Sequence, residues 1–380
     1  MTPKERLLAT LAGHTPDAVP VAPFIQEEYL HWYLKKENPH RLTDGLLCAR
    51  ELGMDFIAKQ HDFSTPYFLK KSYPNWEVDR RTIAANNIVT RTTTIKTPQK
   101  KFIMVESASY QEGNTTGVHL STHEYLIKTP DDFATFAKYM PPMDAADRRA
   151  ILDTGAFARR HLGEDGISAP WSLGSVYNLV STYIDLQEML MAPYEDEAYY
   201  KTYMDFFTRL VIENHEILAT SQFDAVGLQG NIANGSLIGQ TFFEQHIMPY
   251  EQRHLAPLIA ANKPTIYHNC GKARVLYPSY KKLGITAWET ISPPLQGDND
   301  LADAKSYFSD HPLVLIGNLD QVHFLKTATP REVYDKAAEL VTIGKPNAHY
   351  IFSTSDYLEN NTPLENVQAM IAGARSAAKY

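Results

Sequence analysis

Residues 264–271 read Pro-Thr-Ile-Tyr-His-Asn-Cys-Gly, an apolar and β-branched run that ends in polar residues and a glycine. Such a run is typical of a buried strand that leads into a loop. Seven similar runs occur along the chain, each followed by a longer helical pattern. We expect strands at residues 19–24, 54–59, 166–171, 223–230, 264–270, 285–290, 313–319 and 350–355. Eight strands that alternate with helices predict an α/β fold, a parallel (β/α)8 TIM barrel.

One region interrupts this alternation. Residues 82–110 carry Thr-, Ile- and Val-rich runs on both sides of Lys96–Lys101, which predicts an inserted β-hairpin or small sheet over the barrel mouth. Helix starts are indicated at Thr129 and Thr329, because threonine caps a helix and the proline that follows each fits its first turn. No short repeat and no Gly/Ser-rich linker is found, so we expect residues 1–380 to form one elaborated domain.

Composition excludes several classes of partner. The 380 residues include 36 Lys and Arg against 44 Asp and Glu, a net charge of −8, and no basic run that would favour nucleic acid or anionic lipid. The first residues lack the apolar core of a secretory signal, and no apolar stretch reaches the ~18 residues of a membrane helix. We therefore expect a cytoplasmic protein. The two cysteines, Cys48 and Cys270, are too few for a disulfide framework, and Cys48 lies in an apolar helical pattern typical of core.

Candidate functional residues gather at or near the expected strand ends. In a (β/α)8 barrel the carboxyl ends of the strands meet at one mouth, where active sites lie. As catalytic residues we predict Glu289, Asn231 and Asp320, and as substrate-binding residues Trp171, Gln229, Asn234, Tyr267 and Asn318. Other interpretations stay open, since the asparagines also suit turns, Asn318 and Asp320 suit hydrogen bonding at the rim, and aromatic residues are often core.

His268 and Cys270 are the strongest candidates for metal ligands. Residues two apart on a strand point the same way, so the imidazole and the thiolate can share one tetrahedral metal, for which zinc is the natural choice. A third ligand must offer oxygen or nitrogen; Asp356 is the first choice and Glu289 the second. The alternatives are a buried cysteine beside a hydrogen-bonded histidine, a capping role for Asp356, and an acid or structural role for Glu289. Three ligands and one open position describe a catalytic zinc.

Several segments together resemble the uroporphyrinogen decarboxylase-like superfamily. They are residues 2–8 (TPKERLL), 13–21 (GHTPDAVPV), 268–271 (HNCG), 317–320 (GNLD) and 361–366 (NTPLEN). The resemblance spans nearly the whole chain and implies a (β/α)8 barrel. True decarboxylases carry arginines soon after the first strand to hold substrate carboxylates. Here residues 24–30 read Phe-Ile-Gln-Glu-Glu-Tyr-Leu, so we do not expect porphyrinogen binding.

The cobalamin-dependent methyltransferase branch of this superfamily resembles the chain at His268 and Cys270. Its members bind zinc there together with a further cysteine near the C-terminus, where this chain has Asp356. The resemblance implies a zinc methyltransferase whose second reactant is a corrinoid (cobalamin) carried by a separate corrinoid protein, and it allows a homodimer. As the small methylated substrate we expect a methoxylated aromatic, with Glu289 as the acid in its O-demethylation.

Three other functions remain open at this point. The first is methyl transfer from a methyl-corrinoid to a thiol or to tetrahydrofolate, which uses the same site in the other direction. The second is a metal-free decarboxylase or lyase of the same fold. The third is a non-catalytic module that binds corrinoid or metal.

Overall fold

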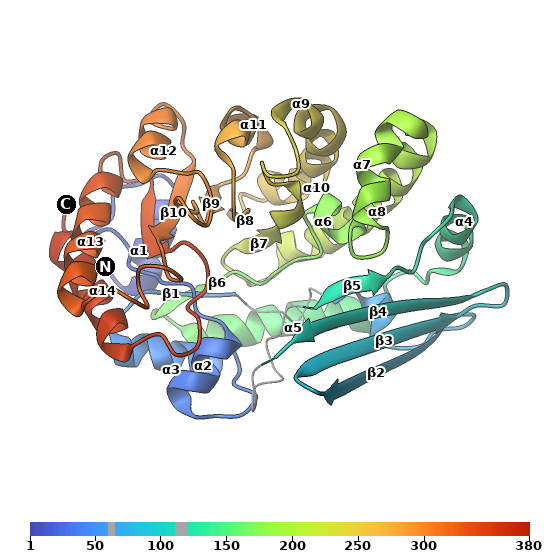
Figure 1. The fold of residues 1–380 in the computed structure, drawn as a ribbon, viewed down its shortest axis with the longest axis horizontal. Coiled ribbons are helices and arrows are strands. Elements are labelled where there is room, and N and C mark those ends of the chain that lie inside the picture. The colour runs from blue at the N-terminus through green and yellow to red at the C-terminus, as the bar shows by residue number, and fades with distance from the viewer. Residues whose placement is uncertain (60–64, 111–119) are drawn as a thin grey trace.

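A computed structural model of the chain describes residues 1–59, 65–110 and 120–380. Parallel strands lie at its centre, with helices packed around them (Figure 1). Five strands pair in the order β11-β10-β9-β8-β7, and β1 and β6 form a separate parallel pair. These strands are β1 (Phe56–Ala58), β6 (Gly166–Ser168), β7 (Val226–Gln229), β8 (Thr265–His268), β9 (Ala287–Glu289), β10 (Val314–Leu319) and β11 (Tyr350–Thr354).

Isolated contacts join the two sets of strands. Trp171, which follows β6, forms a parallel bridge with Gly227 of β7, and Val21 forms one with Phe352 of β11. The N–H of Asp55, just before β1, donates to the carbonyl oxygen of Val21 at 2.8 Å. The parallel segments therefore follow one another in the order expected for a barrel, although the hydrogen-bonded ladders are not continuous around it.

The first segment differs from its prediction. Residues 19–24 were expected to form a strand, but they contribute only the bridge at Val21. Pro20 and Pro23 lie on either side of Val21. Because proline has no N–H to donate, it removes ladder hydrogen bonds and interrupts a strand.

Threonine side chains cap two helices at the starts that the sequence predicted. Thr129 accepts a hydrogen bond from the N–H of Asp132, and Thr329 forms a capping box with Glu332, so both predicted helix starts are confirmed. The helices are α1 (Pro3–Leu11), α2 (Glu27–Leu34), α3 (Thr43–Leu52), α4 (Pro130–Tyr139), α5 (Ala145–Leu162), α6 (Val176–Val180), α7 (Leu186–Glu195), α8 (Glu197–Thr220), α9 (Gln240–Phe242), α10 (Met248–Ala260), α11 (Tyr277–Leu283), α12 (Leu301–Tyr307), α13 (Pro330–Gly344) and α14 (Leu364–Ala377).

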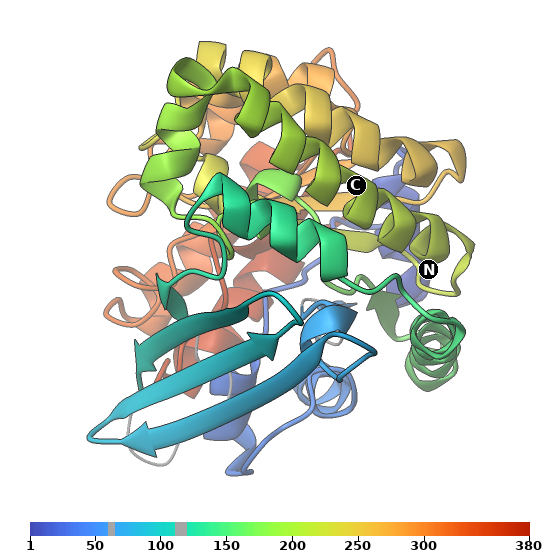
Figure 2. The same ribbon diagram turned by 90° about the vertical axis from the view of Figure 1, so that its right-hand side faces the viewer.

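A second, antiparallel sheet lies between β1 and β6 in the chain. Its strands pair in the order β2-β3-β4-β5, with bounds β2 (Glu77–Ala85), β3 (Ile88–Lys96), β4 (Lys101–Ser109) and β5 (Ser121–Glu124). It extends beyond residues 82–110 at both ends, where a hairpin or small sheet was expected. Phe102 of β4 packs edge-on against Phe136 of α4, with ring centroids 6.1 Å apart. Figures 1 and 2 show this sheet as a layer of its own beside the parallel strands.

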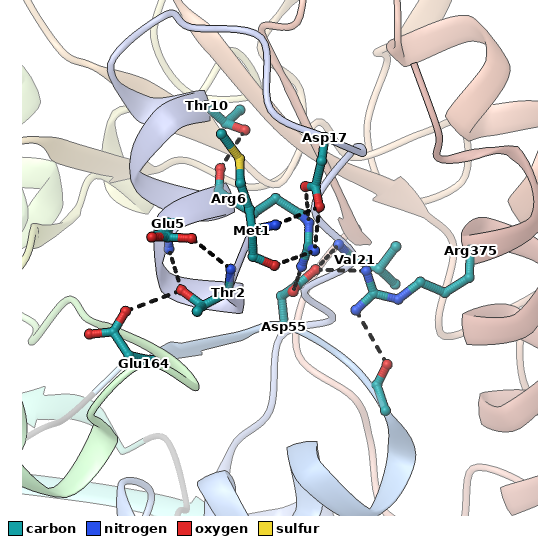
Figure 3. Close-up of polar contacts among 11 residues, drawn as sticks. Met1, Thr2, Glu5, Arg6, Thr10, Asp17, Val21, Asp55, Glu164 and Arg375 are labelled. Atoms are coloured by element: carbon teal, nitrogen blue, oxygen red, sulfur yellow. Dashed lines mark hydrogen bonds and ion pairs between the residues drawn. The ribbon is translucent and has the colours of Figure 1, made fainter.

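Helix α1 covers the amino ends of the parallel strands. Leu7 and Leu11 are buried in a cluster with strand residues such as Ile167 and Ile266. Polar contacts hold the same end together (Figure 3): Arg6 donates to Asp55 at 2.7 Å and to Asp17 at 2.8 Å. The carboxyl ends of the strands are thus left to form the candidate site. None of the helices described is long and apolar enough to cross a membrane.

Candidate metal centre

Three side chains that could ligate a metal meet beyond the carboxyl ends of β8 and β11. His268 ends β8, Cys270 follows in the next loop, and Asp356 lies two residues beyond β11. The donor atoms of these three residues all lie within 4.8 Å of one another. Gly271 then turns the chain with a φ of 85°, in the left-handed region that favours glycine. The three ligands that the sequence suggested are therefore brought together.

The donor set suits zinc. Bonds of roughly 2.0–2.3 Å in a tetrahedral site place neighbouring ligand atoms roughly 3.3–3.8 Å apart. His268 Nε2 lies 3.9 Å from Asp356 Oδ2, close to that separation. One imidazole, one thiolate and one carboxylate also leave a tetrahedral metal one position short of closure, as in catalytic zinc sites.

The other ring nitrogen of His268 contacts Glu289, the last residue of β9. Nδ1 lies 3.1 Å from Glu289 Oε1, and both side chains are buried. The same carboxylate oxygen accepts a hydrogen bond of 2.6 Å from Lys59 Nζ. A carboxylate on the far nitrogen of a metal-bound histidine fixes its tautomer and ring orientation. Glu289 is thus placed behind His268 and is already engaged as an acceptor.

Lys59 is a site residue that the sequence patterns did not single out. It follows β1 and is only 2% exposed. Its Nζ lies 4.4 Å from the ring centroid of Trp171 and 5.7 Å from that of Phe24, so two aromatic rings and one carboxylate surround the charge. The signal was available, because Lys59 ends one of the predicted strand runs, but lysine is usually a surface residue.

Charge and burial shift the pKa values of this cluster. Burial alone lowers the pKa of His268, but contacts with Cys270 and Glu289 and the charge of Asp356 outweigh it and raise the pKa to about 10. Burial alone raises the pKa of Glu289, while the charge of Lys59 and the contact with His268 lower it to about 2. Burial raises the pKa of Asp356. The surroundings of His268 therefore favour a positive charge.

The cluster borders a cavity of about 610 Å³. His268 and Asp356 line it, together with three of the predicted residues: Trp171, Gln229 and Asn231. The ring of Trp171 meets that of His268 edge to face, with centroids 5.6 Å apart. A cavity of this size suits a small molecule.

Four other predicted residues lie away from this cavity lining. Asn234 donates from its side chain to the carbonyl oxygen of Asn231 at 2.6 Å and accepts from the N–H of Ser236 at 2.9 Å, so it shapes its own loop. Tyr267, one residue before His268, is fully buried and packs its ring 5.9 Å from that of Tyr280. Successive strand residues point to opposite sides, which directs Tyr267 towards the helices.

Asn318 and Asp320 line a different cavity, of about 260 Å³, beside β10. Asp320 accepts hydrogen bonds from the N–H groups of Val322 and His323 at 2.9 and 2.8 Å, which stabilise the turn after β10. Its carboxylate therefore stabilises local backbone. Cys48, the other cysteine, is buried in the core as expected.

Comparison with known proteins identifies the family. Residues 116–377 match the family model described as uroporphyrinogen decarboxylase (URO-D). The chain belongs to this family. The match confirms the superfamily resemblance noted in the sequence. A solved structure, a methyltransferase from Methanosarcina mazei, aligns over 99% of both chains with a TM-score of 0.70 at 16% identity. At that identity the likeness concerns the fold alone, and it supports the barrel order of the strands.

Curated relatives of this family member are methyltransferases. One, from Methanosarcina mazei, is named methylated-thiol--coenzyme M methyltransferase and is 24% identical over 173 residues, 46% of this chain and 43% of the relative. Another, from Methanosarcina acetivorans, is named methylcobamide:CoM methyltransferase MtbA and is 22% identical over 173 residues, 46% of this chain and 48% of the relative. The alignments thus span less than half the length of these relatives.

Proposed function

We propose that this chain is a zinc-dependent methyltransferase that moves a methyl group between a small substrate and the cobalt of a corrinoid carried by a partner protein. The observation that carries the proposal is the convergence of His268, Cys270 and Asp356 within 4.8 Å of one another beside a cavity. The names of the relatives, one of which includes methylcobamide, support the same chemistry.

Each residue of the centre has a distinct task in this proposal. His268, Cys270 and Asp356 would hold zinc, which supplies a Lewis acid where a methylated heteroatom or a thiol binds. Glu289 holds the His268 ring by its contact with Nδ1, and Lys59 neutralises Glu289. This arrangement favours an orienting role for Glu289 over the acid role expected from the sequence. Trp171, with its ring beside His268, shields the centre from water on one side.

We propose a methoxylated aromatic as the methyl donor. Among the described residues that line the cavity, Trp171, Tyr125 and Tyr357 offer aromatic rings, and Asn231 offers a buried side-chain oxygen without a hydrogen-bond partner. Asn231 would bind and orient a polar group of the substrate. The names of the relatives favour a second candidate, transfer from a methyl-corrinoid to a thiol, because both names include coenzyme M.

Metal analysis tests the centre. We expect one zinc per chain in the wild type, and substoichiometric zinc in His268→Ala, Cys270→Ala and Asp356→Ala. Cys48→Ala is the matched control, because it removes the other thiol from the buried core. Zinc that stays stoichiometric in Cys270→Ala contradicts the proposed site.

Spectroscopy of the corrinoid tests the reaction and its direction. We expect the zinc-loaded protein to convert cob(I)alamin to methylcobalamin with 4-methoxybenzoate as donor, and the Cys270→Ala variant to do so at least a hundredfold more slowly. Demethylation of methylcobalamin by 2-mercaptoethanesulfonate, without any methylation of cob(I)alamin, selects the second candidate. If neither reaction occurs at any zinc loading, methyl transfer to or from a corrinoid is refuted.

A further inference from the structure

Three ionisable side chains lie on the inward face of the antiparallel sheet. Arg91 of β3 stands directly opposite Glu106 of β4, and Arg80 lies on the neighbouring strand β2. Side chains alternate along a strand, so Arg91 shares its face with Val89 and Ile95, which are 4% and 0% exposed. The charges are therefore on the face that packs inward, where apolar residues are usual.

This charged end of the sheet borders the same cavity as the metal centre. Arg91 and Glu106 line the cavity together with His268 and Asp356. Glu106 is only 8% exposed, yet its Oε2 has no hydrogen-bond partner, and the buried Nε of Arg80 has none either. Burial raises the pKa of Glu106 and lowers that of Arg80, as expected for charges withdrawn from water.

The charges of these three side chains do not balance. Two guanidinium groups and one carboxylate carry one net positive charge between them, and among the described residues no acid lies within ion-pair distance of Arg80 or Arg91. An uncompensated charge in a region of low dielectric is costly, so binding of an anion from solution is favourable there. Guanidinium groups suit carboxylates and sulfonates in particular, because their paired N–H donors match two acceptor oxygens.

We propose that the small substrate carries an anionic group, a carboxylate or a sulfonate, which Arg91 binds while the reacting end of the molecule lies at the metal centre. This inference rests on the proposed function for the identity of the reacting end. Arg91 and His268 both line this cavity, whose volume of about 610 Å³ suits a small molecule. Arg80, on the neighbouring strand, adds positive charge near Arg91, and Glu106 limits the affinity by its opposite charge.

Isothermal titration calorimetry with matched ligands tests the anion site. The ligands are two acid and amide pairs, 4-methoxybenzoate with 4-methoxybenzamide and 3-(methylthio)propionate with its amide, and 4-methoxybenzenesulfonate compares the two anion types. We expect the wild type to bind at least one acid about tenfold or more tightly than its amide, and Arg91→Gln to lose that preference. Arg91→Lys keeps the positive charge and should retain part of the preference for the acid over the amide.

Two further variants separate binding from folding. Glu106→Gln removes the opposing charge, so acids should bind about two- to fivefold more tightly, a gain that mere loss of structure does not produce. Arg81→Gln is the matched control, because Arg81 is 77% exposed, and strand alternation places it on the other face. It should leave all affinities unchanged.

The outcomes are distinct. No acid preference in either pair, or an equal loss of acid and amide binding in Arg91→Gln, overturns the anion site. An acid preference that depends on Arg91, in a protein that binds no zinc and transfers no methyl group, supports the anion site and refutes the proposed function instead.

Discussion

Replacing Lys59 with methionine is expected to lower the free energy of unfolding by about 3–5 kcal/mol. Lys59 Nζ lies 2.6 Å from Glu289 Oε1, and the two side chains are 1% and 6% exposed. Methionine fills similar space but removes the Lys59 charge from the buried Glu289 carboxylate, which keeps its contact with His268. An exposed pair of the same length is worth only about 0–1 kcal/mol, so burial decides the magnitude.

Equilibrium unfolding in urea measures this effect. The matched control is Lys96→Met, because Lys96 pairs with Glu77 at 2.8 Å with both side chains more than half exposed; it should cost about 1 kcal/mol or less. Adding Glu289→Gln to Lys59→Met removes the stranded charge, so the double variant should recover most of the loss. A Lys59→Met protein as stable as the control, or a double variant less stable than Lys59→Met, refutes this account of the buried pair.

Three further effects are expected. Contact with Arg6 lowers the pKa of Asp17 from 3.8 to about 2, so this contact should stabilise the fold above pH 3.8 and cease to do so as the pH falls towards 2. Because Asp17 is 42% exposed, Asp17→Asn should lose about 1 kcal/mol or less of that stabilisation, measured by acid unfolding. Gly344→Ala places a Cβ 2.1 Å from the buried Tyr350 ring and should cost about 1–3 kcal/mol in urea unfolding, whereas Gly239→Ala, with nothing within 4 Å, should change little. Free zinc at a hundred times its Kd should raise the unfolding free energy by about 2.7 kcal/mol. A urea-unfolding midpoint that does not change when zinc is added would contradict a zinc site in the folded protein.

The period-two rule predicted part of the metal centre. Residues two apart on a strand point the same way, which suggested one side of the chain for His268 and Cys270, but β8 ends at His268, so the loop that follows sets the position of Cys270. The same rule would have turned Tyr267 away from the cavity, where it packs against Tyr280. Applied to the antiparallel sheet, it would have placed Arg91 on the face of Val89 and Ile95 and marked it as unusual.

Other features depend on contacts that no local pattern reveals. Asp320 stands at a strand end like Asp356, but N–H groups that follow it in the chain engage its carboxylate. Lys59 and Glu289 are 230 residues apart in sequence, and only the tertiary arrangement of β1 and β9 joins them. Residues 19–24 do not form a regular strand because they contain prolines. The prolines are a local signal, but the prediction gave more weight to the apolar pattern.

Anomalous diffraction at the zinc edge, from crystals of the zinc-loaded protein, tests the central claim most directly. The account predicts one strong peak about 2.0–2.3 Å from His268 Nε2, Cys270 Sγ and a carboxylate oxygen of Asp356. A peak elsewhere, or zinc-loaded crystals in which Cys270 and His268 flank no peak, would contradict it.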